Sequence, residues 1–379
     1  MSTPPPTIVI RTTPRISAIR LVLAVFAGLI ALFLGLLVLL LIGIETGPVA
    51  LLLGLITATL PVPIYVALVL WIDRYEAEPL WMLATAFFWG AFFATFFAFL
   101  INTIGATIVA LLTDAKAGEA FAAVISAPIV EETSKALILF IFFFWKKDEF
   151  DGVVDGIVYA SMTALGFAMM ENILYYGRAA DGGSGSLTLT LVIRGFFAPF
   201  SHPLFTSLTG IGLGLARQSN NTVVKIITPI VGLLMAIFMH SIWNGAAVFA
   251  GGFFVLLYVV VMVPAFLIML IVIAFALRRE GRVVREHLVI DLQRGFLTEE
   301  EYKQLGSILG RMGSSYNAFS RSGMKGWRAR RRFNQLASEL AFHRNRVARG
   351  VYSADQDVLA QETAYLHALQ GLINELRGR

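Results

Sequence analysis

Long apolar runs alternate with short polar segments over the first 277 residues of the chain. An α-helix needs about 20 such residues to cross a bilayer. We expect eight membrane helices, at about 21–43, 49–72, 80–112, 119–145, 153–177, 188–216, 223–250 and 253–277. The third and sixth runs are longer than a bilayer requires, which predicts tilt, a break or protrusion there.

The pattern changes after residue 277, where apolar positions recur at helical spacing but no run is long enough to span a membrane. Thr298–Glu301 and Ser353–Gln356 both fit the capping-box pattern that starts helices. The sequence therefore predicts an all-α polytopic membrane bundle over 21–277 and a basic cytoplasmic helical domain over 278–379. Residues 1–20, rich in Pro and Thr, are expected to form a disordered cytoplasmic tail.

Composition supports the membrane assignment and excludes several kinds of chemistry. Hydrophobic residues make up 57% of the chain and charged residues only 15%, which is not the composition of a soluble globular protein. Cysteine is absent, which excludes disulfides, a thiol nucleophile and a Cys-ligated metal.

Charge is distributed unevenly along the chain. Residues 1–277 carry 12 Lys and Arg against 14 Asp and Glu, whereas residues 278–379 carry 18 against 11. Eleven basic residues lie in the segments expected inside and two, Lys116 and Arg178, in those expected outside. We therefore expect a multi-pass protein of the bacterial plasma membrane with both termini cytoplasmic. The basic run at 325–332 fits either contact with anionic lipid or a solvated helix face; nucleic acid is not favoured, because no nucleic-acid-binding module accompanies the run.

Two adjacent glutamates stand inside the fourth apolar run. An ionisable side chain at the centre of a membrane helix costs roughly 2.5–3.5 kcal/mol, so Glu131 and Glu132 require an explanation. Lys135 lies four and three residues further on, close enough to pair with either glutamate. The group is either an ion pair that locks neighbouring helices together or part of a functional site.

Polar residues in the next three runs favour a functional site. They are Glu171 and Asn172 in the fifth run, His202 in the sixth, and His240 with Asn244 in the seventh. Counted along each helix, Glu131, Glu171, His202 and His240 fall roughly 9–21 Å below the outer surface. Separate helix-locking pairs have no reason to share one depth. Arg194, near the outer end of the sixth run, is expected to reach the interface as a snorkelling residue.

These residue types suit hydrolysis of an amide by water. A buried carboxylate beside a lysine can serve as a general base, and His240 with Asn244 on one helix face can donate hydrogen bonds to an oxyanion. Alternatively, Glu and His side chains can bind Zn²⁺; Glu171, His202 and His240 are the candidates. The chain has no His-Glu-x-x-His, Gly-x-Ser-x-Gly or Gly-rich phosphate loop, so those site types are not supported.

Four motifs in this order and spacing resemble the PrsW family of bacterial intramembrane proteases, which is related to the CAAX prenyl endopeptidases. They are Glu-Glu-x-x-Lys at 131–135, Phe-x-x-x-Glu-Asn at 167–172, the isolated His202, and His-x-x-Trp-Asn at 240–244. The segment 73–79 also looks like the family's sequence at that place. The resemblance covers about residues 50–277.

The resemblance implies proteolysis of a membrane-anchored substrate such as an anti-sigma factor. It implies that Glu131 and Glu132 supply the water-activating carboxylate, that Glu171 and His202 assist, and that His240 and Asn244 bind the oxyanion. Lys135, Phe167 and Asn172 would support the site. The CAAX-type relatives have His at the position of Glu171, which leaves that residue as assisting base, metal ligand or partner of Lys135. Both a metallopeptidase and a metal-free glutamate mechanism fit this set.

A proton- or cation-coupled transporter is the alternative function, because intramembrane carboxylates and histidines also form ion relays. Transporters often contain internal repeats or paired broken helices. No convincing repeat is present in the chain, which favours the protease.

Overall fold

A computed structural model describes residues 18–350 and 358–378 of the chain. Within these ranges every regular element is a helix and no strand occurs, as the sequence predicts. The chain divides into two compact units. One contains Ile19–Asp73 and Glu78–Ile273, and the other contains Arg74–Ala77 together with Ala274–Arg379. The expected disordered tail at 1–20 falls almost entirely outside the described residues.

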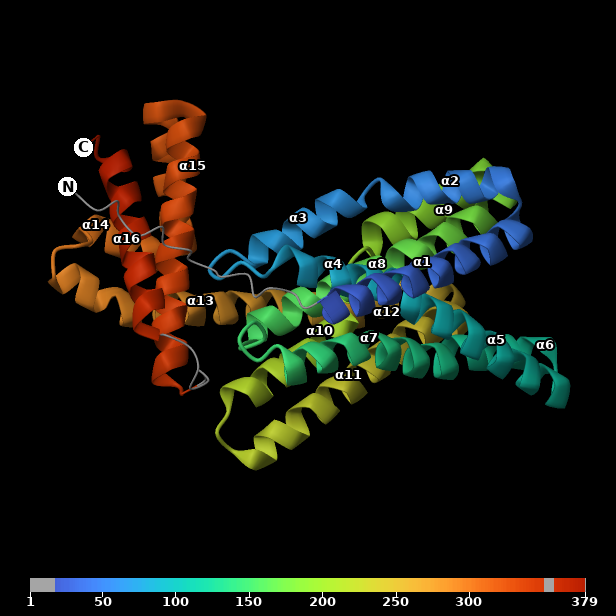
Figure 1. Ribbon diagram of the computed structural model, residues 1–379. Coiled ribbons are helices and arrows are strands. Elements are labelled where there is room, and N and C mark those ends of the chain that lie inside the picture. The colour runs from blue at the N-terminus through green and yellow to red at the C-terminus, as the bar shows by residue number, and fades with distance from the viewer. Residues whose placement is uncertain (1–17, 351–357, 379) are drawn as a thin grey trace. The chain divides into compact units, whose positions relative to one another are not determined.

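The first unit is built from apolar helices (Figure 1). In chain order they are α1 (Ala18–Thr46), α2 (Pro48–Thr59), α3 (Val62–Ile72), α4 (Leu80–Phe88), α5 (Thr95–Leu112), α6 (Ala115–Phe121), α7 (Ala127–Trp145), α8 (Val153–Asp181), α9 (Ser184–Thr190), α10 (Ser201–Gln218), α11 (Thr222–Phe249), α12 (Phe254–Leu257) and the first part of α13 (Val263–Gln293). Short π-helical stretches, among them η1 (Trp89–Ala94), η2 (Ala122–Ser126), η3 (Leu191–Phe197) and η5 (Tyr258–Met262), join several of these helices.

Six helical segments are long and apolar enough to cross a membrane: Val25–Thr46, Pro48–Ile72, Leu80–Leu112, Val153–Asp181, Thr222–Phe249 and Gly251–Gln293. These correspond to six of the eight expected spans. The other two differ for a physical reason. The segment at 119–145 is helical but carries three charged side chains in its centre, and the segment at 188–216 is interrupted between η3 and α10. The interruption agrees with the break expected in the sixth run, and the total of eight spans stays a prediction.

Helix α8 forms the core of the membrane unit. Within its most apolar window 89% of the residues are buried, against 11–17% for the other five segments. Gly156 on α8 and Gly210 on α10 explain how closely these two helices pack: a Cβ atom at either position would lie 2.1 Å from the other's carbonyl oxygen. Small residues allow this backbone-to-backbone approach between membrane helices. The close contact brings α8 and α10, which carry Glu171 and His202, side by side.

The outer helices expose their apolar side chains. Phe26 and Phe33 on α1, Phe238 on α11 and Phe275 on α13 are each more than 60% exposed. Apolar surface on this scale is not found on soluble monomers, and it suits helices that face lipid. The protein is therefore a membrane protein with multiple apolar helices.

The second unit contains the end of α13, α14 (Glu299–Leu305), α15 (Ile308–Ala348) and α16 (Val358–Leu376). Helix α15 is broken at Ser322 and Gly323, where Gly323 has a φ of 61° that favours glycine. Its two arms run antiparallel, because Arg311 contacts Ser338 and Asn334 contacts Ser315. The predicted capping box at Thr298 and Glu301 is confirmed, and the one at 353–356 lies outside the described residues.

The second unit also includes the short loop Arg74–Ala77 that follows α3, which the sequence did not predict. Arg311 donates a hydrogen bond of 2.9 Å to the carbonyl of Arg74, and its guanidinium lies 4.9 Å from the ring centre of Tyr75. Arg346 pairs with Glu76. Thus α15 holds this loop through both arms.

Candidate functional site

The two glutamates lie on the first turns of α7, directly after the π-helical η2. Glu131 is 6% exposed, and Glu132 and Lys135 are fully buried. Lys135 Nζ donates to Glu132 Oε1 at 2.9 Å and to Glu131 Oε2 at 3.3 Å. The spacing of three and four residues therefore produces the ion pairing that the sequence predicts, and with both glutamates at once.

Lys135 also reaches another helix. Its Nζ lies 3.2 Å from His202 Nδ1 on α10 and 3.8 Å from the ring centre of Phe167 on α8. The lysine therefore does more than neutralise the glutamates beside it, because it connects α7 to the helices that carry the rest of the predicted set. Phe167 places its aromatic face over the ammonium group, and its supporting role in the site stays a prediction.

Glu132 is held from two other helices. Its Oε1 accepts from His240 Nδ1 on α11 at 3.0 Å, and its Oε2 accepts from Thr206 Oγ1 on α10 at 2.8 Å. Together with Lys135, these contacts use both oxygens of Glu132. Glu131 differs, because its Oε1 has no hydrogen bond among the described residues, and His240 Nε2 lies 3.9 Å from its Oε2. The less constrained carboxylate is Glu131.

Glu171 on α8 lies between a histidine and an arginine. Its Oε2 is 2.8 Å from His202 Nε2 and 2.5 Å from Arg194 Nη2. Arg194 Nε also donates to Asn172 Oδ1 at 2.6 Å, and its guanidinium lies 3.9 Å from the ring centre of Tyr175. The interfacial position expected for Arg194 is thus wrong: its side chain turns inward to a carboxylate. Glu171 neutralises Arg194 rather than Lys135.

These contacts determine which nitrogen of each histidine carries the proton. Lys135 can only donate, so His202 Nδ1 accepts from it and His202 Nε2–H donates to Glu171. Similarly, His240 Nδ1–H donates to Glu132, which leaves the lone pair of Nε2 on the side of Glu131. Each imidazole therefore presents one lone pair within the cluster and has its other nitrogen held by a carboxylate.

Three of these side chains are arranged as a metal site would require. Glu131, His202 and His240 are buried, and one donor atom from each lies within 4.8 Å of the others. One carboxylate and two imidazoles are a typical protein ligand set for catalytic Zn²⁺, and carboxylates behind the imidazoles hold such ligands in orientation. The residue types and their spacing fit a divalent metal, which would take the lone pair of His202 Nδ1 that Lys135 contacts at 3.2 Å in this structure. This set has Glu131 where the sequence-based candidates have Glu171, whose Oε2 contacts Arg194 and His202.

Asn244 lies one turn beyond His240, as its spacing predicts, but its amide is used elsewhere. Its Nδ2 donates to the carbonyl of Ala123 in η2 at 2.8 Å. Asn172 likewise contacts Arg194 rather than the glutamate pair. Both residues border the site, and the oxyanion role of Asn244 stays a prediction.

Sequence reasoning missed Thr206 and misplaced Arg194. Thr206 follows His202 by four residues, so helical spacing alone could have placed it on the same face. Arg194 carries no comparable signal, because its approach to Glu171 depends on the π-helical η3 and on the non-helical residues between η3 and α10. π-Helical turns often occur at functional sites, but they are not visible in the sequence.

The fold and this buried cluster of carboxylates, imidazoles and a lysine define a polytopic membrane protein with a hydrolase-like centre. Residues 78–269, half of the chain, match the family described as "PrsW family intramembrane metalloprotease". The chain belongs to this family of intramembrane metalloproteases, as its motifs predict. The matched range contains every residue of the cluster.

Individual proteins that resemble the chain carry the name of the same protease family. The protein called Protease PrsW of Geobacillus kaustophilus is 37% identical over 146 residues, which are 38% of this chain and 58% of that protein. Protease PrsW of Oceanobacillus iheyensis is 32% identical over 167 residues, 44% of this chain and 70% of the relative. Protease PrsW of Bacillus subtilis is 30% identical over 148 residues, 39% of this chain and 61% of the relative. No solved structure matches the chain.

Proposed function

We propose that the chain is an endopeptidase that hydrolyses a peptide bond of a membrane-anchored protein. The observation that carries the proposal is the single buried cluster that α7, α8, α10 and α11 build from Glu131, Glu132, Glu171, His202 and His240. Independent helix-locking pairs would not share partners across four helices. Membership in the protease family supports the same activity.

Glu131 is the residue we assign to water activation. A general base needs an oxygen free to accept a proton, and Glu131 Oε1 is free of hydrogen bonds in the described structure, whereas both oxygens of Glu132 are used. Glu132 instead orients His240 and Lys135. Arg194 and Glu171 act in the same way on His202, holding the Nε2–H against the carboxylate.

Glu131, His202 and His240 would hold the metal that the family description implies. Such a metal supplies Lewis acidity toward a carbonyl oxygen and lowers the pKa of bound water. The orientation of both imidazoles by Glu132 and Glu171 serves this ligand set directly. Zn²⁺ is the metal that this donor set suits best.

Asn244 is the proposed donor to the oxyanion; His240, which the sequence pairs with it in this role, uses its one N–H on Glu132 in this structure. Asn244 Nδ2 uses one hydrogen for the carbonyl of Ala123 and keeps a second. Donors that are fixed in place before the reaction contribute roughly 2.7–4 kcal/mol to other hydrolases, so this second hydrogen has a large potential effect.

The substrate we propose is a single-span membrane protein of the anti-sigma-factor type, cleaved in the outer half of the bacterial plasma membrane. The depth of the four acidic and imidazole side chains along their helices and the bias of basic loop residues support that location, with both termini in the cytoplasm. Contact of the basic run at 325–332 with anionic lipid belongs to the same proposal.

The test is cleavage in proteoliposomes of a single-span reporter labelled at both ends. Wild-type protein should cleave it, and the double variant Glu131→Ala/Glu132→Ala should not. Undiminished cleavage by the double variant contradicts the proposal. The transporter alternative is tested in the same vesicles: pH-dependent cation uptake that the double variant loses, with no reporter cleavage by the wild type, would replace the protease assignment.

A further inference from the structure

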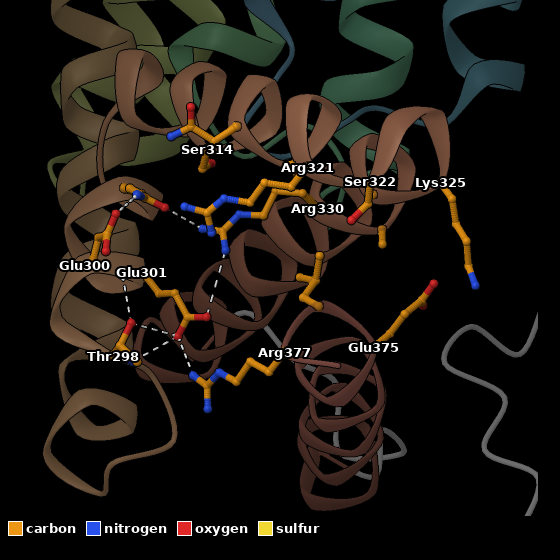
Figure 2. A pocket seen from close by; sticks show the side chains of 16 residues that line it. Thr298, Glu300, Glu301, Ser314, Arg321, Ser322, Lys325, Arg330, Glu375 and Arg377 are labelled. Carbon is orange, nitrogen blue, oxygen red and sulfur yellow. Dashed lines mark hydrogen bonds and ion pairs between the residues drawn. The ribbon is translucent and has the colours of Figure 1, made fainter. Parts of the chain in front are cut away.

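A polar cavity of about 400 Å³ lies within the second unit, between α14, both arms of α15, and α16 (Figure 2). Its walls carry four basic side chains, Arg321, Lys325, Arg330 and Arg377, and three acidic ones. Every wall comes from the segment 298–377, which lies beyond the range matched by the protease family. The catalytic cluster contributes no residue to it.

The break in α15 gathers the basic residues. Arg321 ends the first arm, and Lys325 and Arg330 lie on the second arm beyond the turn at Ser322 and Gly323. Without this turn they would lie along one continuous helix. Gly326 permits the turn to close, because a Cβ atom there would lie 2.6 Å from the carbonyl oxygen of Ala318.

The acidic residues of the cavity do not balance these cations. Glu301 Oε2 accepts from Arg377 at 2.8 Å and from Thr298, while its Oε1 lies 3.9 Å from Arg330 Nη1. A single carboxylate thus serves two guanidinium groups and a helix cap. Glu300 accepts from Gln304, which in turn accepts from Arg330.

Arg330 is the buried member of the four, and its charge is poorly compensated. The residue is 7% exposed, its one carboxylate contact is at 3.9 Å, and its buried Nε has no hydrogen-bond partner. Burial lowers the pKa of the Arg330 guanidinium below its usual range. The negative charges of Glu301 and Glu300 offset only part of this lowering. A buried cation without a close counter-charge is costly, and a bound anion removes that cost.

Arg321 and Lys325 provide donors that face the cavity and are not used. Figure 2 draws no hydrogen bond or ion pair on either side chain, and Arg321 lies alongside Arg330. The guanidinium groups of Arg321 and Arg330, side by side in a polar cavity, match the charge and the oxygen geometry of a phosphate group, and Lys325 adds positive charge at the other end of the cavity. We propose that this cavity binds a phosphate-bearing anion, either a soluble phosphate compound or the headgroup of an acidic lipid.

Part of the basic run at 325–332 thereby has a specific role, which is to bind the anion. Lys325 and Arg330 line the cavity, whereas Arg331 lies over the ring of Trp327 at 4.7 Å and Arg328 is exposed outside it. The run is therefore not one uniform basic surface. Arg328 supplies a matched control, since it has the same charge on the same helix but does not line the cavity.

The test is calorimetric titration of inorganic pyrophosphate into the full chain in phosphatidylcholine nanodiscs. Wild-type protein should bind, the Arg321→Gln/Lys325→Gln variant should bind at least roughly tenfold more weakly, and Arg328→Gln should bind as the wild type does. Both altered side chains are exposed, so the variant should stay folded, which its thermal unfolding curve checks. Absence of binding, or equal binding by the double variant, overturns the proposal.

A second arm distinguishes the two sources of the phosphate group. Nanodiscs that contain phosphatidic acid should weaken pyrophosphate binding if the lipid headgroup enters the cavity, and should leave it unchanged if the ligand is soluble. Reporter cleavage by Arg321→Gln/Lys325→Gln in the absence of added phosphate should equal that of the wild type. Failure of the phosphate site is thus separate from failure of the protease assignment.

Discussion

Each unit of the protein buries a cation, and the two cations are compensated in opposite ways. Lys135, in the membrane unit, has carboxylate oxygens at 2.9 and 3.3 Å, and a histidine nitrogen at 3.2 Å. Arg330, in the second unit, has one carboxylate oxygen at 3.9 Å that belongs to a residue shared with Arg377. Lys135 therefore finds its counter-charges within the protein, and we call its surroundings the complete cluster; the cavity around Arg330, the incomplete cluster, has room for an anion from outside.

The difference follows from what each environment permits. In hydrocarbon no water compensates a charge, so every ionised group of the membrane cluster needs a partner within the protein. The second unit is built from amphipathic helices, and a polar cavity there can admit water or a solute. A complete cluster is suited to chemistry that the chain performs by itself, and an incomplete one is suited to ligand binding.

The largest expected effect comes from opening the complete cluster. Glu132→Gln removes a charge that contacts Lys135, His240 and Thr206, so a buried ammonium group loses its nearest partner. Breaking a buried pair in this way costs about 3–5 kcal/mol. We expect a large drop in the thermal unfolding temperature in detergent and loss of reporter cleavage. Glu119→Gln, an exposed change on α6, should alter neither; equal melting of both variants would contradict the role of Glu132.

Arg194→Gln tests the outer edge of the same cluster. The change leaves Glu171 with His202 alone, so the imidazole loses part of its orientation. Residues that hold a ligand histidine through a second group typically contribute 10–100-fold to activity or metal affinity. We expect kcat for reporter cleavage to fall within roughly that range while KM changes little, and Arg194→Lys to recover part of kcat. An unchanged kcat would show that Arg194 has a purely structural role.

Glu301→Gln tests the incomplete cluster. It removes the carboxylate that Arg330 and Arg377 share and weakens the capping box at Thr298. Loss of a cap and of partly buried charge contacts should cost about 1–3 kcal/mol, seen as faster amide hydrogen exchange in α14. Reporter cleavage should be unchanged. Glu299→Gln breaks only an exposed pair with Lys303 and should leave the amide hydrogen-exchange rate of α14 unchanged. Similar acceleration of exchange in both variants would show that Glu301 does not stabilise α14 more than an exposed glutamate does.

The smallest effect concerns a buried carboxyl group outside both clusters. Asp73, just beyond the second span, is 5% exposed, and burial together with Asp155 raises the pKa of its carboxyl to about 8 from 3.8. Because the folded pKa lies above the unfolded one, this group's contribution to stability is present below about pH 4 and is lost as pH rises through about 8. Asp73→Asn should therefore flatten the fall in unfolding temperature between about pH 5 and pH 9. An unchanged slope would mean that Asp73 is already ionised in the folded protein.

Sequence spacing predicted those parts of the site that lie within one helix. Glu131, Glu132 and Lys135 pair as the intervals of three and four residues require, and Thr298 and Glu301 form the expected cap. The all-α fold and the family also follow from the sequence, because long apolar runs and four spaced motifs are local signals. The position of Arg194 does not, since it depends on a helix break and on a partner 23 residues away.

The charge balance of the second unit also cannot be predicted from the sequence. The basic run at 325–332 was visible in the sequence, but the turn at Ser322 and Gly323 decides which of its members face inward. A Ser-Gly pair inside a long helical pattern does not by itself indicate a reversal of the chain. Inclusion of Arg74–Ala77 in this unit was not predictable either, because it depends on contacts with Arg311 and Arg346, more than 200 residues further along the chain.

The most direct test of the proposed catalytic cluster is the rate at which Glu131→Gln cleaves the single-span reporter in proteoliposomes. This change keeps the side-chain volume but removes the carboxylate of the adjacent pair whose Oε1 has no hydrogen bond within the described residues. Glu45→Gln, an exposed change that breaks only the pair with Arg178, is the matched control. The account predicts a loss of about 10²–10⁴-fold for Glu131→Gln and a wild-type rate for the control. Cleavage by Glu131→Gln at the wild-type rate would contradict it.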